Sequence, residues 1–183
     1  QTVEVGTSFA SITLDDYVED VETADENIIW SFAGNSELLV VITDRVATIS
    51  APSSEWIGSE TISFIATDDD ASDPLDASDE AVFEATCTNS APVVDDIPDQ
   101  TINIGGTFAP ITLNDFVTDA ETADEDITWS VSGNTNLTIS IADGVATITV
   151  DDDEWIGSET VTFTATDNAV CAESASDDVV LTV

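Results

Sequence analysis

The stretch EWIGSETISFIATDD, residues 55–69, occurs again as EWIGSETVTFTATDN at residues 154–168. From Glu159 to Thr166 apolar and polar residues alternate, and Thr, Val and Phe are frequent. An alternation of period two predicts a β-strand that turns one face to the core. Since the whole stretch occurs twice, it predicts that the chain builds one strand-based unit twice.

The repeat extends well beyond this stretch. A shift of 99 positions aligns residues 1–68 with residues 100–167 without a gap, and more than half of the aligned pairs are identical. After one extra residue in the first copy, residues 77–85 align with residues 175–183. The segment between the copies, residues 86–99, is rich in Pro, Asn and Asp and predicts a linker with an edge strand. We therefore predict two domains, residues 1–88 and 89–183, of which the first lacks its first edge strand.

The second copy shows the strand pattern best. Short runs of alternating, β-branched residues predict strands at 101–104, 109–113, 127–132, 137–142, 145–150, 159–166 and 177–183, with an edge piece at 91–94. Residues 142–144, Ala-Asp-Gly, predict a tight hairpin turn. Residues 113–126 do not alternate, and they predict an irregular acidic loop or a helical turn. The fold class expected is all-β: two tandem seven-stranded Greek-key β-sandwiches of the cadherin-like or Ig-like kind.

The charge excludes several classes of function. The chain has 39 acidic residues and one basic residue, Arg45, which gives a formal net charge of −38. Such a chain has no cationic face for nucleic acid and is repelled by anionic lipid. Without His or Lys, most catalytic nucleophile–base pairs are absent, so we expect no enzyme. No apolar run is long enough to insert into a membrane. The like charges require screening by salt or by divalent cations.

The ordered motifs resemble a known family. NSAPVV (89–94), the Gly-Thr of VEVGT (3–7), TDAETADEDITWSV (118–131) and TVTFTATD (160–167) are similar to the cadherin repeat. They are most similar to the cadherin-like tandem repeats of bacterial and archaeal surface proteins. In that family Ca²⁺ lies between successive domains and stiffens the rod. The resemblance implies an inter-domain Ca²⁺ site formed by Glu4, Glu55, Asn89, Asp119, Glu121 and Asp167.

The resemblance also implies unsatisfied ends. The first copy retains Asp20, Glu22 and Asp68, the counterparts of Asp119, Glu121 and Asp167. The second copy retains Glu154, the counterpart of Glu55, together with the adjacent Asp153. These five acids are possible inter-subunit Ca²⁺ ligands. A head-to-tail neighbour would complete these sites. A heterologous contact that does not close generates a filament. The partner expected is therefore another copy in a homopolymer, or the rest of a longer array.

Two further features concern covalent chemistry. Cys87 ends the last predicted strand of the first copy, and Cys171 lies in the loop before the last strand of the second copy. An inter-domain disulfide between them is expected in an oxidising compartment; two separate thiols and bridges between subunits are the alternatives. Asn136 begins the one N-glycosylation sequon, Asn-Leu-Thr.

Tryptophans separate the remaining alternatives. Trp30 and Trp129 are expected to be buried on central strands, and Trp56 and Trp155 to plug one end of the core. If the last two were exposed, they could stack on sugars. The function predicted is a structural extracellular protein: a calcium-stiffened rod in a cell-surface filament, adhesin or S-layer-like array. The alternatives are an adhesion module that binds cell-surface glycans or proteins, and salt-adapted spacer domains without metal.

Overall fold

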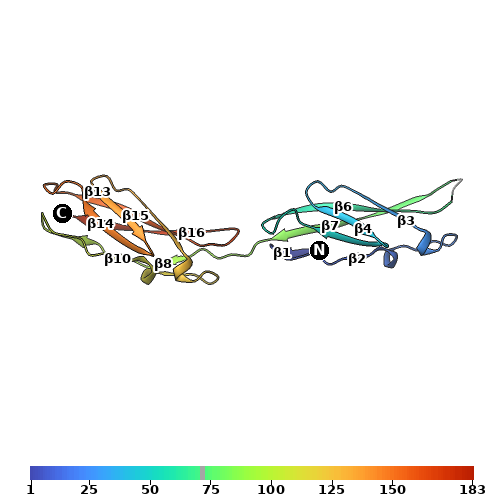
Figure 1. The fold of residues 1–183 in the computed structure, drawn as a ribbon, viewed down its shortest axis with the longest axis horizontal. Helices are drawn as coiled ribbons and strands as arrows, with labels where there is room; N and C mark the ends of the chain where they lie inside the picture. The colour runs from blue at the N-terminus through green and yellow to red at the C-terminus, as the bar shows by residue number, and fades with distance from the viewer. Residues whose placement is uncertain (71–72) are drawn as a thin grey trace. The chain divides into compact units, whose positions relative to one another are not determined.

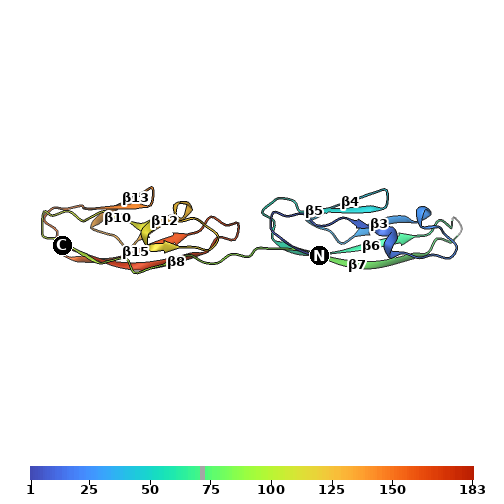
Figure 2. The ribbon, with the colours of Figure 1, turned by 90° about the horizontal axis from the view of Figure 1, so that it is seen from below.

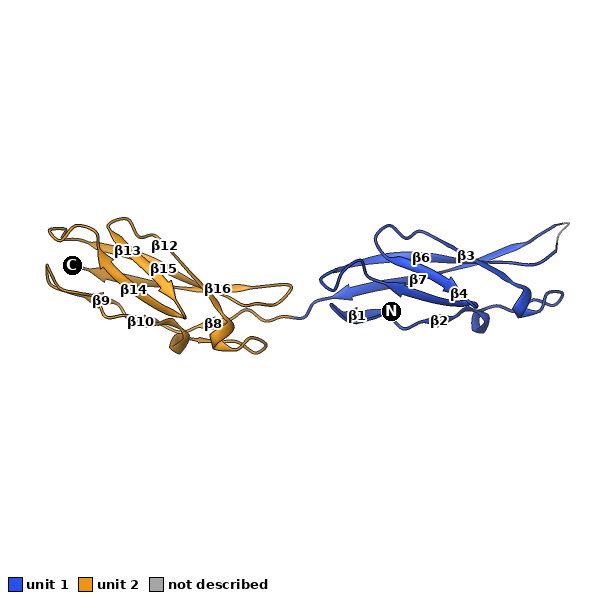
Figure 3. Cartoon of the chain, viewed as in Figure 1, with its two compact units in different colours: residues 1–88 blue, residues 89–183 orange. Residues whose placement is uncertain are grey.

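The computed structural model describes residues 1–70 and 73–183, which form two compact units, residues 1–88 and residues 89–183 (Figure 3). Regular structure in the described residues consists of β-strands and short 3₁₀ helices, without any α-helix. The prediction of an all-β chain is confirmed. The part of the chain that is described also has no helix with the length and apolarity needed to cross a bilayer.

Unit 1 is built from two sheets. The larger has the strand order β1-β7-β6-β3 and the smaller the order β2-β5-β4. Neighbouring strands are antiparallel, except that β1 runs parallel to β7. The strands are β1 (Thr2–Glu4), β2 (Ile12–Thr13), β3 (Ile29–Ala33), β4 (Leu39–Thr43), β5 (Val46–Ser50), β6 (Gly58–Thr67) and β7 (Asp76–Thr86), and the 3₁₀ helices are η1 (Leu14–Tyr17) and η2 (Asp25–Asn27).

Unit 2 repeats this plan and adds one ladder. Its larger sheet has the order β12-β15-β16-β9 and its smaller sheet the order β10-β14-β13, while β8 and β11 form a separate antiparallel pair. The strands are β8 (Val93–Val94), β9 (Gln100–Thr101), β10 (Ile111–Thr112), β11 (Val117–Thr118), β12 (Thr128–Ser132), β13 (Leu137–Ala142), β14 (Val145–Val150), β15 (Ser158–Thr166) and β16 (Ser174–Thr182), and the 3₁₀ helices are η3 (Leu113–Phe116) and η4 (Asp124–Asp126).

Within each unit the two sheets lie in separate layers, as Figures 1 and 2 show. The alternation in the repeated stretch decides which side chains lie between the layers: Ile62, Phe64 and Ala66 of β6 are buried, and so are their counterparts on β15. Phe83 of β7 contacts Phe64 edge to face, at a centroid distance of 6.4 Å. Burial of these apolar side chains is the main stabilising term in each unit.

Two predicted strands are much shorter than expected. The predicted strand at 101–104 ends at Thr101, because the chain turns at Gly105, where φ is 73°, and Gly106 donates its N–H to the carbonyl of Asn103. The predicted strand at 109–113 shrinks to β10, since the side chain of Gln100 bonds both the N–H and the carbonyl of Ala109. A side-chain amide here takes the place of a neighbouring strand.

The predicted hairpin turn is present in both units. Asp143 and Gly144 have φ of 50° and 71°, which is the type I′ conformation that follows strand twist. The first copy has Arg45 in place of the glycine, at φ 63°. Arg45 forms an ion pair within unit 1, since its Nε–H donates to Oδ2 of Asp15 at 2.6 Å.

The tryptophans differ in part from the expectation. Trp129 is buried and Trp30 half-buried, but their strands, β12 and β3, are the edges of their sheets rather than central strands. Trp56 and Trp155 pack against the cores of their units and are half-buried. Their indole rings lie so close to Gly58 and Gly157 that a Cβ there would come within 2.9 and 2.7 Å of ring carbon atoms. Each ring is therefore partly covered by its own unit.

Candidate metal site of unit 2

Asp119 lies directly after β11, and its two carboxylate oxygens have different surroundings. Oδ1 accepts hydrogen bonds from the backbone N–H groups of Glu121 and Thr122, at 2.9 and 2.6 Å, and so holds the acidic loop in a turn. Oδ2 is buried and has no hydrogen-bond partner among the described residues. A buried carboxylate oxygen without a donor is costly unless a cation compensates it.

Asn89 shows the same division between its two polar atoms. Its Nδ2 donates to Oδ2 of Asp167 at 2.8 Å and to the carbonyl of Cys171 at 3.1 Å. Its Oδ1 is buried and, within the described residues, has no donor. The amide is therefore fixed by its nitrogen, and its oxygen remains available to a ligand.

Asp167 follows β15 and is 3% exposed. Oδ1 accepts from the N–H of Ala169 at 3.0 Å, and Oδ2 accepts from the N–H of Glu173 at 3.0 Å in addition to Asn89. Burial alone would raise the pKa of this carboxyl. The hydrogen bonds, the largest of which comes from Asn89, outweigh burial and hold the pKa below its ordinary value of 3.8. Asp167 is therefore a buried carboxylate that stays ionised at neutral pH.

These residues come together at one end of unit 2. Asn89 contacts Asp167, while its neighbour Ser90 lies with Oγ 3.5 Å from Oε1 of Glu121. Four of the six residues of the predicted set thus lie in connected segments. No group of three Cys, His, Asp or Glu side chains in the described residues is arranged to hold a metal. The candidate donors are instead mixed, one amide oxygen with carboxylates.

Unit 1 builds the same turns without the amide. Oδ1 of Asp20 accepts from the N–H groups of Glu22 and Thr23, at 2.8 and 2.5 Å, and Asp68 accepts from the N–H groups of Asp70 and Leu75. In the described part of unit 1 no residue corresponding to Asn89 covers them, and Asp20 is exposed. The proposed inter-subunit roles of Asp20, Glu22 and Asp68 stay predictions.

The remaining predicted ligands lie on exposed surface. Oε1 of Glu4 accepts the N–H of Thr88 at 2.8 Å, and Glu55 is exposed at the same end of unit 1. Whether these two share an ion with unit 2 stays a prediction. Asp153 and Glu154 are exposed in unit 2, also without a test of their inter-subunit role.

One pair of carboxylates was missed by sequence reasoning. Glu60 on β6 accepts hydrogen bonds from the N–H groups of Ser36, Glu37 and Leu38, and so clamps the β3–β4 loop. Burial would raise the pKa of Glu60, yet the hydroxyl of Ser36, which also donates to this carboxylate, and the three N–H groups lower it below its ordinary value of 4.5. Glu159 binds Thr135 and Asn136 in the same way, with the same direction of pKa shift. The only sequence signal was the recurrence of this Glu in both copies.

Both cysteines, Cys87 and Cys171, are disulfide-bonded. Their pairing across the two domains stays a prediction. Asn136, the sequon residue, is exposed and donates Nδ2–H to Glu159 Oε1 at 2.8 Å. Glycosylation would have to replace this hydrogen bond, and it too stays a prediction.

Comparison with known proteins gives no family. No family model matches the chain, and no curated protein matches it. Similar solved structures include the protocadherin GammaB4 extracellular domain (19% identity, TM-score 0.36), an endo-fucoidan hydrolase from glycoside hydrolase family 107 (19%, 0.36) and the human desmocollin-1 ectodomain (10%, 0.36). They cover 87%, 86% and 99% of this chain, which spans 28%, 24% and 38% of theirs. At such TM-scores and identities, these likenesses do not assign a family or a function.

Proposed function

We propose that the chain is a non-catalytic structural module of an extracellular filament or array, stiffened by calcium. Each unit would be a cadherin-like, Greek-key β-sandwich that serves as one link of a rod. The observation that carries the proposal is that two oxygens of unit 2, Asn89 Oδ1 and Asp119 Oδ2, are buried without a partner among the described residues, while Asn89 also contacts the carboxylate of Asp167. Because the net charge is −38, cations are needed to screen the repulsion between carboxylates.

The donor set suits calcium better than a transition metal. The candidate atoms are carboxylate and amide oxygens, and the chain has no His. Hard oxygen donors favour Ca²⁺, which takes six to eight ligands. Asn89, Asp119, Glu121 and Asp167 would supply part of that number. The others would come from water or, as the resemblance implies, from Glu4 and Glu55.

Bound calcium would supply positive charge where carboxylates are buried or crowded. In this chain, Asn89 at the start of unit 2 bonds Asp167, which follows β15, and the carbonyl of Cys171, which lies between β15 and β16. An ion bound there would hold the segment that precedes unit 2, and so would fix the direction in which the chain enters unit 2. The same purpose would be served between subunits by acids of two neighbouring chains: Asp20, Glu22 and Asp68 of one chain, and Asp153 and Glu154 of the next. Both disulfide-bonded cysteines are in keeping with an oxidising, extracellular location.

The alternatives predict different responses. An adhesion module that binds glycans through Trp56 or Trp155 is not favoured, since both rings pack on glycine backbone and core. Spacer domains without metal would respond to ionic strength alone. Thermal melts in millimolar CaCl₂, in NaCl of matched ionic strength and in EGTA separate the two: the proposal requires a rise in the melting midpoint in CaCl₂ only.

Assembly needs a separate test, because a module can bind calcium and remain a monomer. Negative-stain electron microscopy of the chain with calcium and then with EGTA is expected to show filaments that disperse when calcium is removed. Single particles under both conditions would contradict the homopolymer. They would leave a longer covalent array as the form of the rod.

A further inference from the structure

One edge strand of unit 1 is apolar on its outer face. β4 lies at the edge of the smaller sheet, and among the described residues it pairs with β5 alone. Leu39 and Val41 of β4 face away from the core and are 60% and 47% exposed. No residue of β4 is charged, although the chain has 39 acids. An exposed, apolar edge strand is a template for pairing with a further strand.

Unit 2 has the same edge with a polar surface. β13 is the edge strand of its smaller sheet, and there Thr138 and Ser140 occupy the two outer positions. The hydroxyl of Thr138 donates to Oδ1 of Asp151 at 2.6 Å, so this edge also carries a charge. The residue of unit 1 that corresponds to Asp151 is Pro52. Because the strand forms in unit 2 with polar outer residues, the fold does not require the apolar pair of β4.

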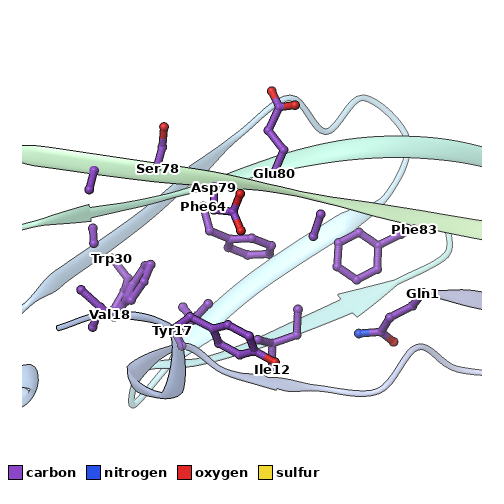
Figure 4. Close-up of a pocket in the computed structure, with 14 residues that line it drawn as sticks. Gln1, Ile12, Tyr17, Val18, Trp30, Phe64, Ser78, Asp79, Glu80 and Phe83 are labelled. Atoms are coloured by element: carbon purple, nitrogen blue, oxygen red, sulfur yellow. The ribbon is translucent and has the colours of Figure 1, made fainter.

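The other large apolar surface of unit 1 is unsuited to a second copy of the chain. Figure 4 shows Tyr17 and Phe64 in a groove of about 360 Å³, which Asp79 and Glu80 of β7 also line. A concave surface does not fit closely against its own copy, and the acids of the two copies would repel each other. The outer edge of β4 has neither obstacle.

The β4 edge is complementary to itself about a two-fold axis. In an antiparallel pair centred on Val41, Leu39 of each copy lies opposite Thr43 of the other. Val40 then lies opposite Ile42 on the face that covers the core. Exposed side chains therefore meet exposed ones, and core-facing side chains meet core-facing ones, because side chains alternate between the two faces of a sheet. Two three-stranded sheets would become one continuous sheet.

The same register brings opposite charges together at both ends of the pair. It places Glu37 of each copy opposite Arg45 of the other, and Arg45 is the one basic residue of the sequence. Within the described residues, Arg45 bonds Asp15 through Nε alone, so its terminal amino groups can bond a second carboxylate. Glu37 is exposed. The corresponding residues of unit 2, Asn136 and Gly144, have no charge, so β13 lacks this complementarity.

We propose that β4 of unit 1 is a self-association edge, at which two copies of the chain pair β4 with β4, antiparallel about Val41. Such an isologous contact closes at two copies, so it differs from the head-to-tail contact of the proposed filament. It neither uses calcium nor rests on the proposed function. Because one strand of each copy supplies most of the contact, the interface is small, and the dimer should form only at high protein concentration.

Sedimentation velocity tests the proposal with the whole chain in EGTA, over a wide range of protein concentration and with enough NaCl to screen the net charge. The expected result is a reversible equilibrium between monomer and dimer. Leu39→Thr combined with Val41→Ser gives β4 the outer residues of β13, and it should weaken the dimer about tenfold or more, since it removes the apolar contact. Tyr17→Ala removes a more exposed apolar side chain, in the groove, and should leave the equilibrium unchanged.

Cysteine cross-linking tests the register. Residues directly opposite each other in an antiparallel pair have Cα atoms about 4.5–5.5 Å apart, which is within the range that a disulfide spans. Val41→Cys should therefore oxidise to a covalent dimer, because this residue faces its own copy. Thr43→Cys alone should not, but its mixture with Leu39→Cys should. Cys87 and Cys171 are already disulfide-bonded and do not compete.

Three results would overturn the proposal. One is a chain that remains monomeric at every concentration in EGTA. A second is association that the double substitution in β4 does not weaken, or that Tyr17→Ala weakens equally. The third is a dimer that Val41→Cys does not cross-link, or that Thr43→Cys alone cross-links equally well. Calcium binding by unit 2 is measured separately, so a failure here is distinguishable from a failure of the calcium-stiffened rod.

Discussion

The side-chain N–H of Asn89 donates to Oδ2 of Asp167 at 2.8 Å, and this bond ties the first residue of unit 2 to the residue that directly follows β15. The bond explains why Asp167 is ionised although 3% exposed. It also aligns Asn89 so that Oδ1 is left unpartnered among the described residues. A residue that the sequence suggested only as a ligand therefore also has a structural role without metal.

Substitution of Asn89 separates these two roles. Asn89→Ala removes a donor to a buried carboxylate, so in EGTA the free energy of unfolding of unit 2 should fall by about 1–3 kcal/mol. Asn89→Asp should destabilise at least as much in EGTA, because it sets two carboxylates side by side, and calcium should restore most of the loss. Urea unfolding with and without calcium measures both. A loss in Asn89→Asp that calcium does not reduce would show that the position is structural alone.

The loop clamps give a prediction about pH. Although burial opposes it, hydrogen-bond donors lower the pKa values of Glu60 and Glu159 in the folded protein: the Ser36 hydroxyl and backbone N–H groups at Glu60, and backbone N–H groups with the Asn136 amide at Glu159. These carboxylates therefore contribute stability that is fully present above the unfolded pKa, near 4.5. That contribution is lost as pH falls through the lower folded pKa. Glu159→Gln should cost about 1–2 kcal/mol of unfolding free energy at pH 7 and progressively less below pH 4.5.

Chemical denaturation at a series of pH values tests this expectation. Glu125→Gln, at an exposed position of η4, is the control and should have little effect at any pH. A Glu159→Gln penalty that stayed constant from pH 7 to pH 3 would mean that packing of the side chain, and not its charge, holds the loop.

Arg45 gives a test of the turn. In unit 2, Gly144 leaves room for Asn114, which lies against it and accepts the indole N–H of Trp129. In unit 1, Arg45 instead forms an ion pair with Asp15, the counterpart of Asn114. Trp30 Nε1 is then left without a partner among the described residues. The double substitution Arg45→Gly with Asp15→Asn should recreate the second arrangement. We expect it to raise the melting midpoint of unit 1 by a few degrees, because it removes a positive φ at a non-glycine residue and satisfies a buried donor.

The single variants control for separate effects. Arg45→Gly alone should gain less, since it also leaves Asp15 without its ion pair. Asp15→Asn alone should lose stability because Arg45 then has no carboxylate. A double variant no better than the sum of the two would rule out a new hydrogen bond from the indole of Trp30 to the amide introduced by Asp15→Asn.

Repetition and alternation predicted most of the fold. The hairpin of β13 and β14 was predicted to the residue, because Asp-Gly specifies its turn and alternation its register. β9 was overestimated because the chain turns at Gly105, and β10 because a side chain, Gln100, bonds backbone that a pattern assigns to a strand. For the site, family resemblance selected Asn89, Asp119 and Asp167, but one Glu such as Glu60 is not distinguishable among 39 acids without its contacts.

The cysteines allow a covalent test. Since Cys87 and Cys171 are the only cysteines and both are disulfide-bonded, non-reducing peptide mapping should yield one cross-linked peptide that contains both. The same bond in a monomer, isolated by size exclusion, would distinguish it from a bridge between subunits. Peptides with alkylated, separate thiols would contradict it.

The central claim is that unit 2 holds a calcium ion on Asn89, Asp119 and Asp167, and isothermal titration of the whole chain with CaCl₂ tests it most directly. Asp119→Asn keeps Oδ1 for the turn and removes the charge of the unpartnered oxygen, while Asp20→Asn makes the same change in unit 1, where the described residues offer no matching amide. The account predicts a saturable site that is lost in Asp119→Asn and kept in Asp20→Asn. Equal calcium binding by the three proteins, or none above the effect of matched NaCl, would contradict it.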